Sequence, residues 1–152
     1  MRILIIAAGK LKPGPLKALE QHYAGRIAAK LVIQEVAEKR KLPPADLKER
    51  EGALLLESCP KDSVLVALDE RGNALASAEF ARRLGQWRDN GVRDLVFLIG
   101  GAEGLSESVK KRAALLLSLG PATWPHFLAR GMLLEQIYRA ETLLAGHPYH
   151  RE

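Results

Sequence analysis

The chain has 152 residues, 47% of them hydrophobic, and carries 23 Lys and Arg against 18 Asp and Glu, a net charge of +5. This length predicts a single globular domain over residues 1–152. No apolar run approaches the ~20 residues that cross a bilayer, so we expect no membrane span. The excess of positive charge is typical of proteins that bind nucleic acid or another polyanion.

Apolar runs without regular polar alternation separate amphipathic segments along the whole chain, and such runs predict strands covered on both faces. In chain order we predict a strand at 2–8, a helix ending near 29, a strand at 31–36, a helix at 45–58, a strand at 63–69, a helix at 77–90, a strand at 95–100, a helix at 106–114, a strand within 115–120 and a helix at 125–145. This alternation predicts an α/β fold with three layers and a mainly parallel sheet.

Local signals set several of these boundaries. Ser77 and Ser106 are placed to cap the helices that follow them, and Gly91 is a C-terminal stop. Residues 70–73 are expected to form a turn that ends the third strand. The apolar start of the chain is interpreted as a buried strand and not a signal peptide, because no small-residue cleavage site follows it.

Two glycine-containing stretches follow predicted strands. The first, GKLKPGP, has two glycines at P-loop spacing but lacks the Lys-Ser or Lys-Thr pair that must follow the second. In the second, Gly100 and Gly101 are adjacent, so the dinucleotide fingerprint does not fit, and Glu103 would repel a phosphate. The second stretch is therefore either an ordinary tight turn or a place where backbone closely approaches an uncharged or cationic cofactor.

The cysteine and histidine pattern predicts no metal site. Cys59 is the single cysteine, which excludes an intrachain disulfide and favours a reducing cytoplasm. His22, His126, His147 and His150 show none of the spacings of metal-binding motifs. We expect His22 to be solvated, whereas His126, at the start of the last helix, could cap that helix or meet a substrate.

The last helix and the tail GHPYHRE carry unusual residues. Pro148 adds stiffness, Tyr149 can stack on an unpaired RNA base, and His150 can form hydrogen bonds. The alternative is a tail that simply packs on the body of the protein. Arg130 could lie on a solvated helix face. Gly131 costs about 1 kcal/mol relative to Ala, so we expect another backbone or a ligand to come close there.

Segments spread over nearly the whole chain resemble one known family. They are MRILIIAAGKLK, LDERG, VFLIGGAEGLS, LSLGPATWPHFLAR, EQIYRA and GHPYHRE. In these the chain is similar to the ribosomal RNA large subunit methyltransferase H family, within the SPOUT class of methyltransferases. The segments after residue 64 are the most specific. The resemblance implies a parallel α/β sheet with a C-terminal trefoil knot.

The resemblance also implies a reaction, in which a methyl group passes from S-adenosylmethionine to N3 of a pseudouridine in 23S ribosomal RNA. By residue-by-residue match, the loops that hold the cofactor contain Leu68, Gly100, Leu119, Gly120, Pro121, Ala122, Thr123 and Trp124. This cofactor has no phosphate and a positive sulfonium, so neither phosphate motif is needed and Glu103 is acceptable beside it.

The family is homodimeric, with its active site near the interface. The resemblance therefore implies a cytoplasmic homodimer that acts on 23S ribosomal RNA in the assembled ribosome. N3 of the base carries a proton that must leave, which requires an acceptor or stabilisation of the developing anion. The catalytic candidates are His126, Tyr149 and His150, with Arg130 as electrostatic partner. We expect Tyr149 and His150 to hold the flipped base and Arg130 to orient the base or a phosphate.

The sequence departs from the family's usual pattern at two places. Residues 120–123, Gly-Pro-Ala-Thr, replace a Ser-x-Met-Thr run in the third cofactor loop, and Gly131 stands where valine is usual. We expect the backbone contacts of the loop and the activity to survive. Three other functions stay open: a noncatalytic ribosome-binding factor, a transferase acting on transfer RNA or unmodified uridine, and a generic nucleotide-binding protein.

Overall fold

The computed structural model describes residues 1–151. Its five strands form one sheet in the order β2-β1-β4-β3-β5, and every neighbouring pair is parallel. The elements are β1 (Arg2–Ala8), α1 (Pro15–Ala24), β2 (Leu31–Val36), α2 (Pro44–Glu57), β3 (Val64–Asn73), α3 (Ser77–Asp89), β4 (Asp94–Ile99), α4 (Glu107–Arg112), β5 (Leu115–Leu117), α5 (His126–Ala145) and the 3-10 helix η1 (Pro148–Arg151). The predicted α/β fold with a parallel sheet is confirmed, whereas the trefoil knot stays a prediction.

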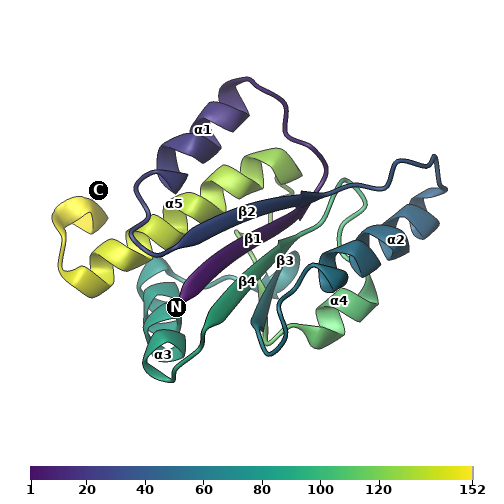
Figure 1. Ribbon diagram of the computed structural model, residues 1–152. Helices are drawn as coiled ribbons and strands as arrows, with labels where there is room; N and C mark the ends of the chain where they lie inside the picture. Colours follow the sequence, from purple (N-terminus) through teal and green to yellow (C-terminus); the bar gives the residue numbers. More distant parts are fainter. Residues whose placement is uncertain (152) are drawn as a thin grey trace.

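Helices cover both faces of the sheet (Figure 1). α1, α3 and α5 lie on one face, with α5 packed against both of the others, and α2 and α4 lie together on the opposite face. The central strands β1 and β4 are therefore buried along almost their whole length. Burial on both faces explains why their sequences show no polar alternation.

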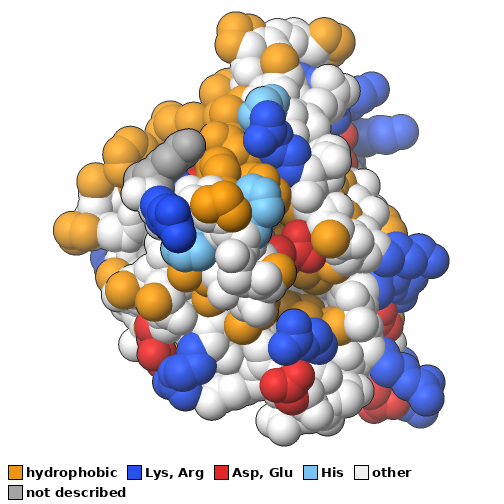
Figure 2. Space-filling model, turned by 90° about the vertical axis from the view of Figure 1, so that its left-hand side faces the viewer, with side chains coloured by type: hydrophobic (Ala, Val, Ile, Leu, Met, Phe, Trp, Pro, Cys, Tyr) orange, Lys and Arg blue, Asp and Glu red, His pale blue; other side chains and the backbone are white. Residues whose placement is uncertain are grey.

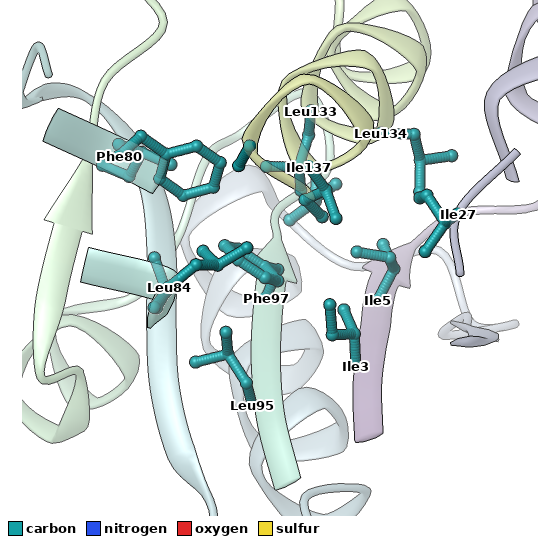
Figure 3. Packing of buried hydrophobic residues seen from close by; sticks show 14 of the residues in the cluster. Ile3, Ile5, Ile27, Phe80, Leu84, Leu95, Phe97, Leu133, Leu134 and Ile137 are labelled. Atoms are coloured by element: carbon teal, nitrogen blue, oxygen red, sulfur yellow. The ribbon is translucent and has the colours of Figure 1, made fainter. Parts of the chain in front are cut away.

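Each face of the sheet packs against its own hydrophobic core. On the α5 side, side chains from β1 and β4 point toward α3 and α5 (Figure 3); the labelled residues are Ile3, Ile5, Ile27, Phe80, Leu84, Leu95, Phe97, Leu133, Leu134 and Ile137. The alternate residues of the same strands point the other way, and Leu4, Ile6, Val96 and Leu98 pack with Leu55 and Val109 of α2 and α4. The two cores hold the sheet between the helix layers.

One strand boundary differs from the prediction. β3 continues through the residues expected to form a turn and ends at Asn73, which pairs with Leu117 of β5 after an irregularity. β5 ends at Leu117, because the Ser118 hydroxyl closes a turn by accepting a hydrogen bond from the Gly120 N–H at 3.1 Å. β5 thus lies within the predicted range 115–120, and the residues after it form a loop.

The helix ends are set partly by contacts that are distant in sequence. Ser106 caps α4 as predicted, with its Oγ accepting a hydrogen bond from the Val109 N–H. Ser77 is instead the first residue of α3, and its hydroxyl donates to Gln136 on α5 at 2.8 Å. α1 ends at Ala24 and not near residue 29, since the N–H groups of the residues at 28 and 29 donate to the carboxylate of Glu141.

Parallel strands place all their carboxyl ends at one edge of the sheet (Figure 1). The loops that follow the five strands therefore gather at this edge, although they are far apart in sequence. In open α/β sheets, ligands bind outside the carboxyl ends of the strands. A functional site is therefore expected at this edge.

Candidate functional site

A cleft of about 380 Å³ lies at the carboxyl edge of the sheet, where the second half of β3 meets the loops after β4 and β5. It is large enough for a small organic cofactor. Its apolar walls are Leu68, Ile99, Leu105, Leu117, Leu119, Ala122 and Ala129. Its polar and charged lining includes Lys48, Asp69, Glu70, Arg71, Glu103, Lys110, Thr123 and His126.

The glycine turn after β4 forms one wall of this cleft. Gly104 returns to pair with Gly101, and its N–H donates to the Gly101 carbonyl at 3.0 Å. A Cβ atom at Gly100 would lie 2.6 Å from the carbonyl carbon and oxygen of Gly104, so no other residue fits without moving backbone. Because the turn doubles back on itself, its backbone is exposed to whatever occupies the cleft.

The β5–α5 loop forms the facing wall and is tied to β3. The Thr123 hydroxyl donates to the Glu70 carboxylate at 2.7 Å, and the Trp124 indole N–H donates to the Leu119 carbonyl at 3.3 Å. Gly120 has a φ of +112°, a conformation that side-chain-bearing residues rarely adopt. Contacts within the loop and to β3 therefore hold the loop in one shape.

The residues expected to hold a cofactor lie together, with one exception. The cleft is lined by Leu68, Gly100, Leu119, Gly120, Ala122, Thr123 and Trp124. Pro121, in the same loop, is exposed and does not line the cleft. The three expected cofactor segments thus come from β3 and from the loops after β4 and β5, and they meet at one site.

The charged residues Asp69 and Lys110 line the cleft and were missed from the sequence. Their ion pair measures 3.2 Å. Desolvation alone would raise the pKa of Asp69, but the Arg71 N–H and the Lys110 ammonium outweigh it and lower this pKa. Asp69 directly follows Leu68 at the end of the strand predicted at 63–69, which was the available signal. Lys110 is one of several lysines and arginines on α4, so nothing local distinguished it.

His126 lines the cleft as the first residue of α5, where it does not cap the helix. Its ring lies 4.2 Å, centroid to centroid, from that of Phe127. Burial lowers the pKa of His126, and the positive charge of Arg130 lowers it further. The imidazole is therefore neutral at pH 7 and can accept a proton.

Arg130, expected to touch the base or a phosphate, lies instead in the interior. Its side chain is 0% exposed and is ion-paired with Glu35 at 2.6 Å and Glu20 at 3.6 Å. It also donates to the Gly9 carbonyl at 2.8 Å. α1, β2 and the loop after β1 surround Arg130, so it does not line the cleft, and its contacts here are with Glu20, Glu35 and Gly9.

Tyr149 and His150 are not brought to the cleft of their own chain. The tail packs against the middle of α5, where the Tyr149 hydroxyl donates to Glu135 at 3.1 Å and its ring lies 4.5 Å from that of Tyr138. Glu135 and Tyr138 lie roughly 14–18 Å along α5 from His126, because an α-helix rises 1.5 Å per residue. Figure 2 shows this face, where hydrophobic and histidine side chains gather around the end of the chain.

A second cavity, of about 570 Å³, separates the tail from the cleft and is mainly apolar. Its walls come from α1, α5, the start of α3 and residues 117–120. At its floor, a Cβ atom on Gly131 would lie 2.7 Å from the Leu19 side chain. What approaches Gly131 is therefore the Leu19 side chain of α1, and not the backbone or ligand that the sequence predicted. The residues at 117, 119 and 120 line both this cavity and the cleft.

Comparison with known proteins shows which family the chain resembles along its whole length. The family model described as a predicted SPOUT methyltransferase matches residues 1–150. The chain is 54% identical to a protein of Rhodospirillum centenum named Ribosomal RNA large subunit methyltransferase H, and 51% identical to one of that name from Paramagnetospirillum magneticum. Each alignment covers 99% of both chains.

Solved structures share the fold at low sequence identity. A probable methylase family protein from Haemophilus influenzae superposes with a TM-score of 0.56 at 12% identity, covering 97% of this chain and 69% of that one. A putative methyltransferase from Legionella pneumophila, solved with bound SAM, gives 0.51 at 13% identity, covering 92% and 66%. Within residues 1–151, no helix has the length and apolar character needed to cross a membrane.

Proposed function

Because this chain belongs to the SPOUT methyltransferase family, we propose that it transfers a methyl group from S-adenosylmethionine to N3 of a pseudouridine in 23S ribosomal RNA of the assembled ribosome. One observation carries the proposal. Leu68, the glycine turn and the 119–124 loop meet in one cleft, in a chain about half identical over its full length to proteins named for ribosomal RNA methylation. A cytoplasmic location belongs to the same proposal, since ribosomes are the substrate.

The cleft fits the cofactor chemically. The tight approach at Gly100 leaves backbone groups accessible for an adenine edge, and apolar walls such as Leu119 can cover its faces. Glu103, which belongs to no ion pair within residues 1–151, suits a cationic group, whereas Asp69 is already paired with Lys110. When bound, the cofactor supplies an electrophilic methyl group on positively charged sulfur.

The residues of the chain then position the base and remove its proton. In-line attack on a methyl carbon depends largely on holding the nucleophilic nitrogen in place. His126, neutral and at the cleft, is the group available to accept the N3 proton. The pKa of Tyr149 is raised by burial and by its neighbours Tyr23 and Glu135, so Tyr149 stays a neutral hydrogen-bond donor and not a base.

A homodimer completes the proposed site. The tail and the cleft of one chain are separated by the second cavity and by several turns of α5. Tyr149 and His150 can therefore hold a base at the cleft only if a second copy of the chain supplies them. The apolar walls of the cavity support a covering partner, and Trp124 at 43% and Leu144 at 41% exposure are large hydrophobic side chains that such a partner would cover.

The test is methyl transfer from labelled S-adenosylmethionine to ribosomes that lack the modification, with the product nucleotide identified by mass spectrometry. We expect methylation at N3 of one pseudouridine. The amount of this product should fall in the variants His126→Gln, Tyr149→Phe and His150→Ala. Cofactor binding without incorporation would contradict the RNA substrate and support a noncatalytic or transfer-RNA role. Failure to bind S-adenosylmethionine would contradict the proposal that the protein is a methyltransferase.

A mixing experiment tests the dimer separately. A cofactor-site variant, Gly100→Ala, is mixed and refolded with a tail variant, Tyr149→Ala. If the tail acts on the partner's cleft, a mixed dimer has one intact site, and about a quarter of wild-type activity returns from two inactive parents. Parents that stay inactive after mixing, with mixed dimers present by mass spectrometry, would contradict action between subunits.

A further inference from the structure

Two neighbouring loops at the carboxyl edge of the sheet carry exposed lysines that the cleft does not use. Lys10 and Lys12 lie in residues 9–14, after β1, and Lys39 and Lys41 lie in residues 37–43, after β2. These four residues are called the basic rim here. All four are exposed, and none belongs to an ion pair within the described residues 1–151.

The sheet places the two loops side by side. β1 and β2 are parallel neighbours in register from Ile3 and Leu31 to Ala8 and Val36. The Gly9 N–H donates to the Val36 carbonyl at 2.8 Å, so the two loops leave the sheet together. Adjacent strands lie about 4.8 Å apart. Lysines from two loops that are distant in sequence therefore form one cationic surface.

The acidic groups at the end of β2 and in the loop that follows it, Glu35 and Glu38, are already ion-paired inside the protein. Glu38 binds both Arg40, at 3.1 Å, and Arg50, at 2.9 Å, and Glu35 binds the buried Arg130. These contacts also fix the loop, because Glu38 accepts the backbone N–H of Arg40 at 3.0 Å. The lysines of the basic rim are therefore not ion-paired within the described part of the chain, and the backbone of the loop after β2 is fixed by hydrogen bonds.

The rim adjoins the cleft. A Cβ atom at Gly9, one residue before Lys10, would lie 3.7 Å from Nε2 of His126, which lines the cleft. The cleft itself carries exposed Glu70 and Glu103. The same lining also holds Lys48, Arg71 and Lys110, so the charges of the cleft balance and a polyanion is attracted mainly to the β1–β2 side.

From this arrangement we propose that the basic rim binds the phosphodiester backbone of the RNA substrate beside the target nucleotide. The inference rests on the proposed function for the identity of the RNA, and it adds the surface on which that RNA lies. Lysine contacts to phosphate position a nucleic acid without reading its sequence. Each such contact releases counterions, so replacing a lysine that binds phosphate lowers the salt dependence of binding.

The test compares two double variants of equal charge change. Lys39→Gln/Lys41→Gln alters the rim. Lys30→Gln/Lys61→Gln removes two exposed lysines from the loops before β2 and β3, at the opposite edge of the sheet. Both proteins are titrated with unmodified 23S ribosomal RNA at several salt concentrations, and cofactor affinity is measured as the check on folding.

We expect the rim variant to bind the RNA at least tenfold more weakly. The slope of log K against log salt should fall by about 1.5, at roughly 0.7–0.9 per phosphate neutralised. The control should keep the wild-type slope, and both variants should keep wild-type cofactor affinity. Equal RNA affinity for the rim variant and the control would overturn the proposal.

Two further outcomes separate this proposal from others. If the rim variant loses affinity for large ribosomal subunits but not for free 23S RNA, the rim binds ribosomal protein and the RNA assignment is overturned. If wild type binds RNA through the rim but transfers no methyl group, the rim is upheld and the proposed reaction fails. The same measurements on Lys10→Gln/Lys12→Gln show whether the first loop contributes.

Discussion

The Nη1 atom of Arg130 lies 2.6 Å from the Oε2 atom of Glu35, a contact that joins α5 to β2 across 95 residues of sequence. The same carboxylate oxygen accepts the Leu11 N–H at 2.7 Å. One ion pair thus holds a helix, a strand and the loop that carries the first half of the basic rim. Its place behind the cleft makes it a support for the site and not a part of it.

Arg130→Ala should lower the free energy of unfolding by about 3–5 kcal/mol, because it leaves buried carboxylates unpaired. Arg82→Ala, which removes an exposed ion pair to Glu79, is the matched control and should leave the free energy of unfolding close to that of the wild type. Denaturant unfolding measures both. Full stability of Arg130→Ala together with an inactive enzyme would instead indicate a direct catalytic role.

The protein should lose stability in acid through Glu35. Desolvation alone would raise the pKa of Glu35, but hydrogen bonds from Leu11 and Arg130 outweigh it and lower this pKa below the ordinary 4.5. A carboxyl group with a lowered folded-state pKa stabilises above its unfolded pKa, and this contribution disappears as the pH falls through the folded value. Unfolding measured from about pH 7 to about pH 3 should show this loss. Glu35→Gln should be less stable at neutral pH, and its free energy of unfolding should fall less steeply in acid. If the variant and the wild type lose stability equally in acid, other groups cause the loss.

The rate of methyl transfer should have an acid limb set by His126. Burial and the nearby Arg130 place the pKa of His126 below its ordinary 6.5. The imidazole is therefore neutral at pH values above its pKa, and it loses its capacity to accept a proton as the pH falls through that pKa. We expect kcat to be flat near neutrality and to fall as the pH drops below this ordinary value. His126→Gln should lower kcat by roughly 10²–10⁴-fold and remove the limb; a limb that persists in the variant belongs to another group.

Gly100→Ala should weaken cofactor binding at least tenfold, about 1.4 kcal/mol, because its new methyl group would meet Gly104 backbone at 2.6 Å. Gly101→Ala is the neighbouring control. Its methyl group would meet the flexible carboxylate end of Glu51 at 3.1 Å, so a smaller loss is expected. Isothermal titration with S-adenosylmethionine gives both affinities, and similar affinities would show that the turn does not contact the cofactor.

Much of the fold follows from local patterns in the sequence. Continuous apolar runs identified the strands, because a strand covered on both faces has no polar side. The Ser106 cap was likewise visible, since its hydroxyl acts within its own helix turn. The missed boundaries have non-local causes: β3 runs on to Asn73 because β5 pairs with it, and α1 stops where Glu141 of α5 takes the following N–H groups.

The sequence by itself determined the strand order along the chain, the family resemblance and the residue types of the cofactor loops, because these are carried by contiguous segments. Only the tertiary structure decided which segments meet. It brought Leu68, Gly100 and the 119–124 loop together through parallel strands that end at one edge, and it buried Arg130 between Glu35 and Glu20. It also set Tyr149 far along α5 from His126. Such distances depend on how helices pack across the sheet, a property of residues far apart in the chain that no local pattern records.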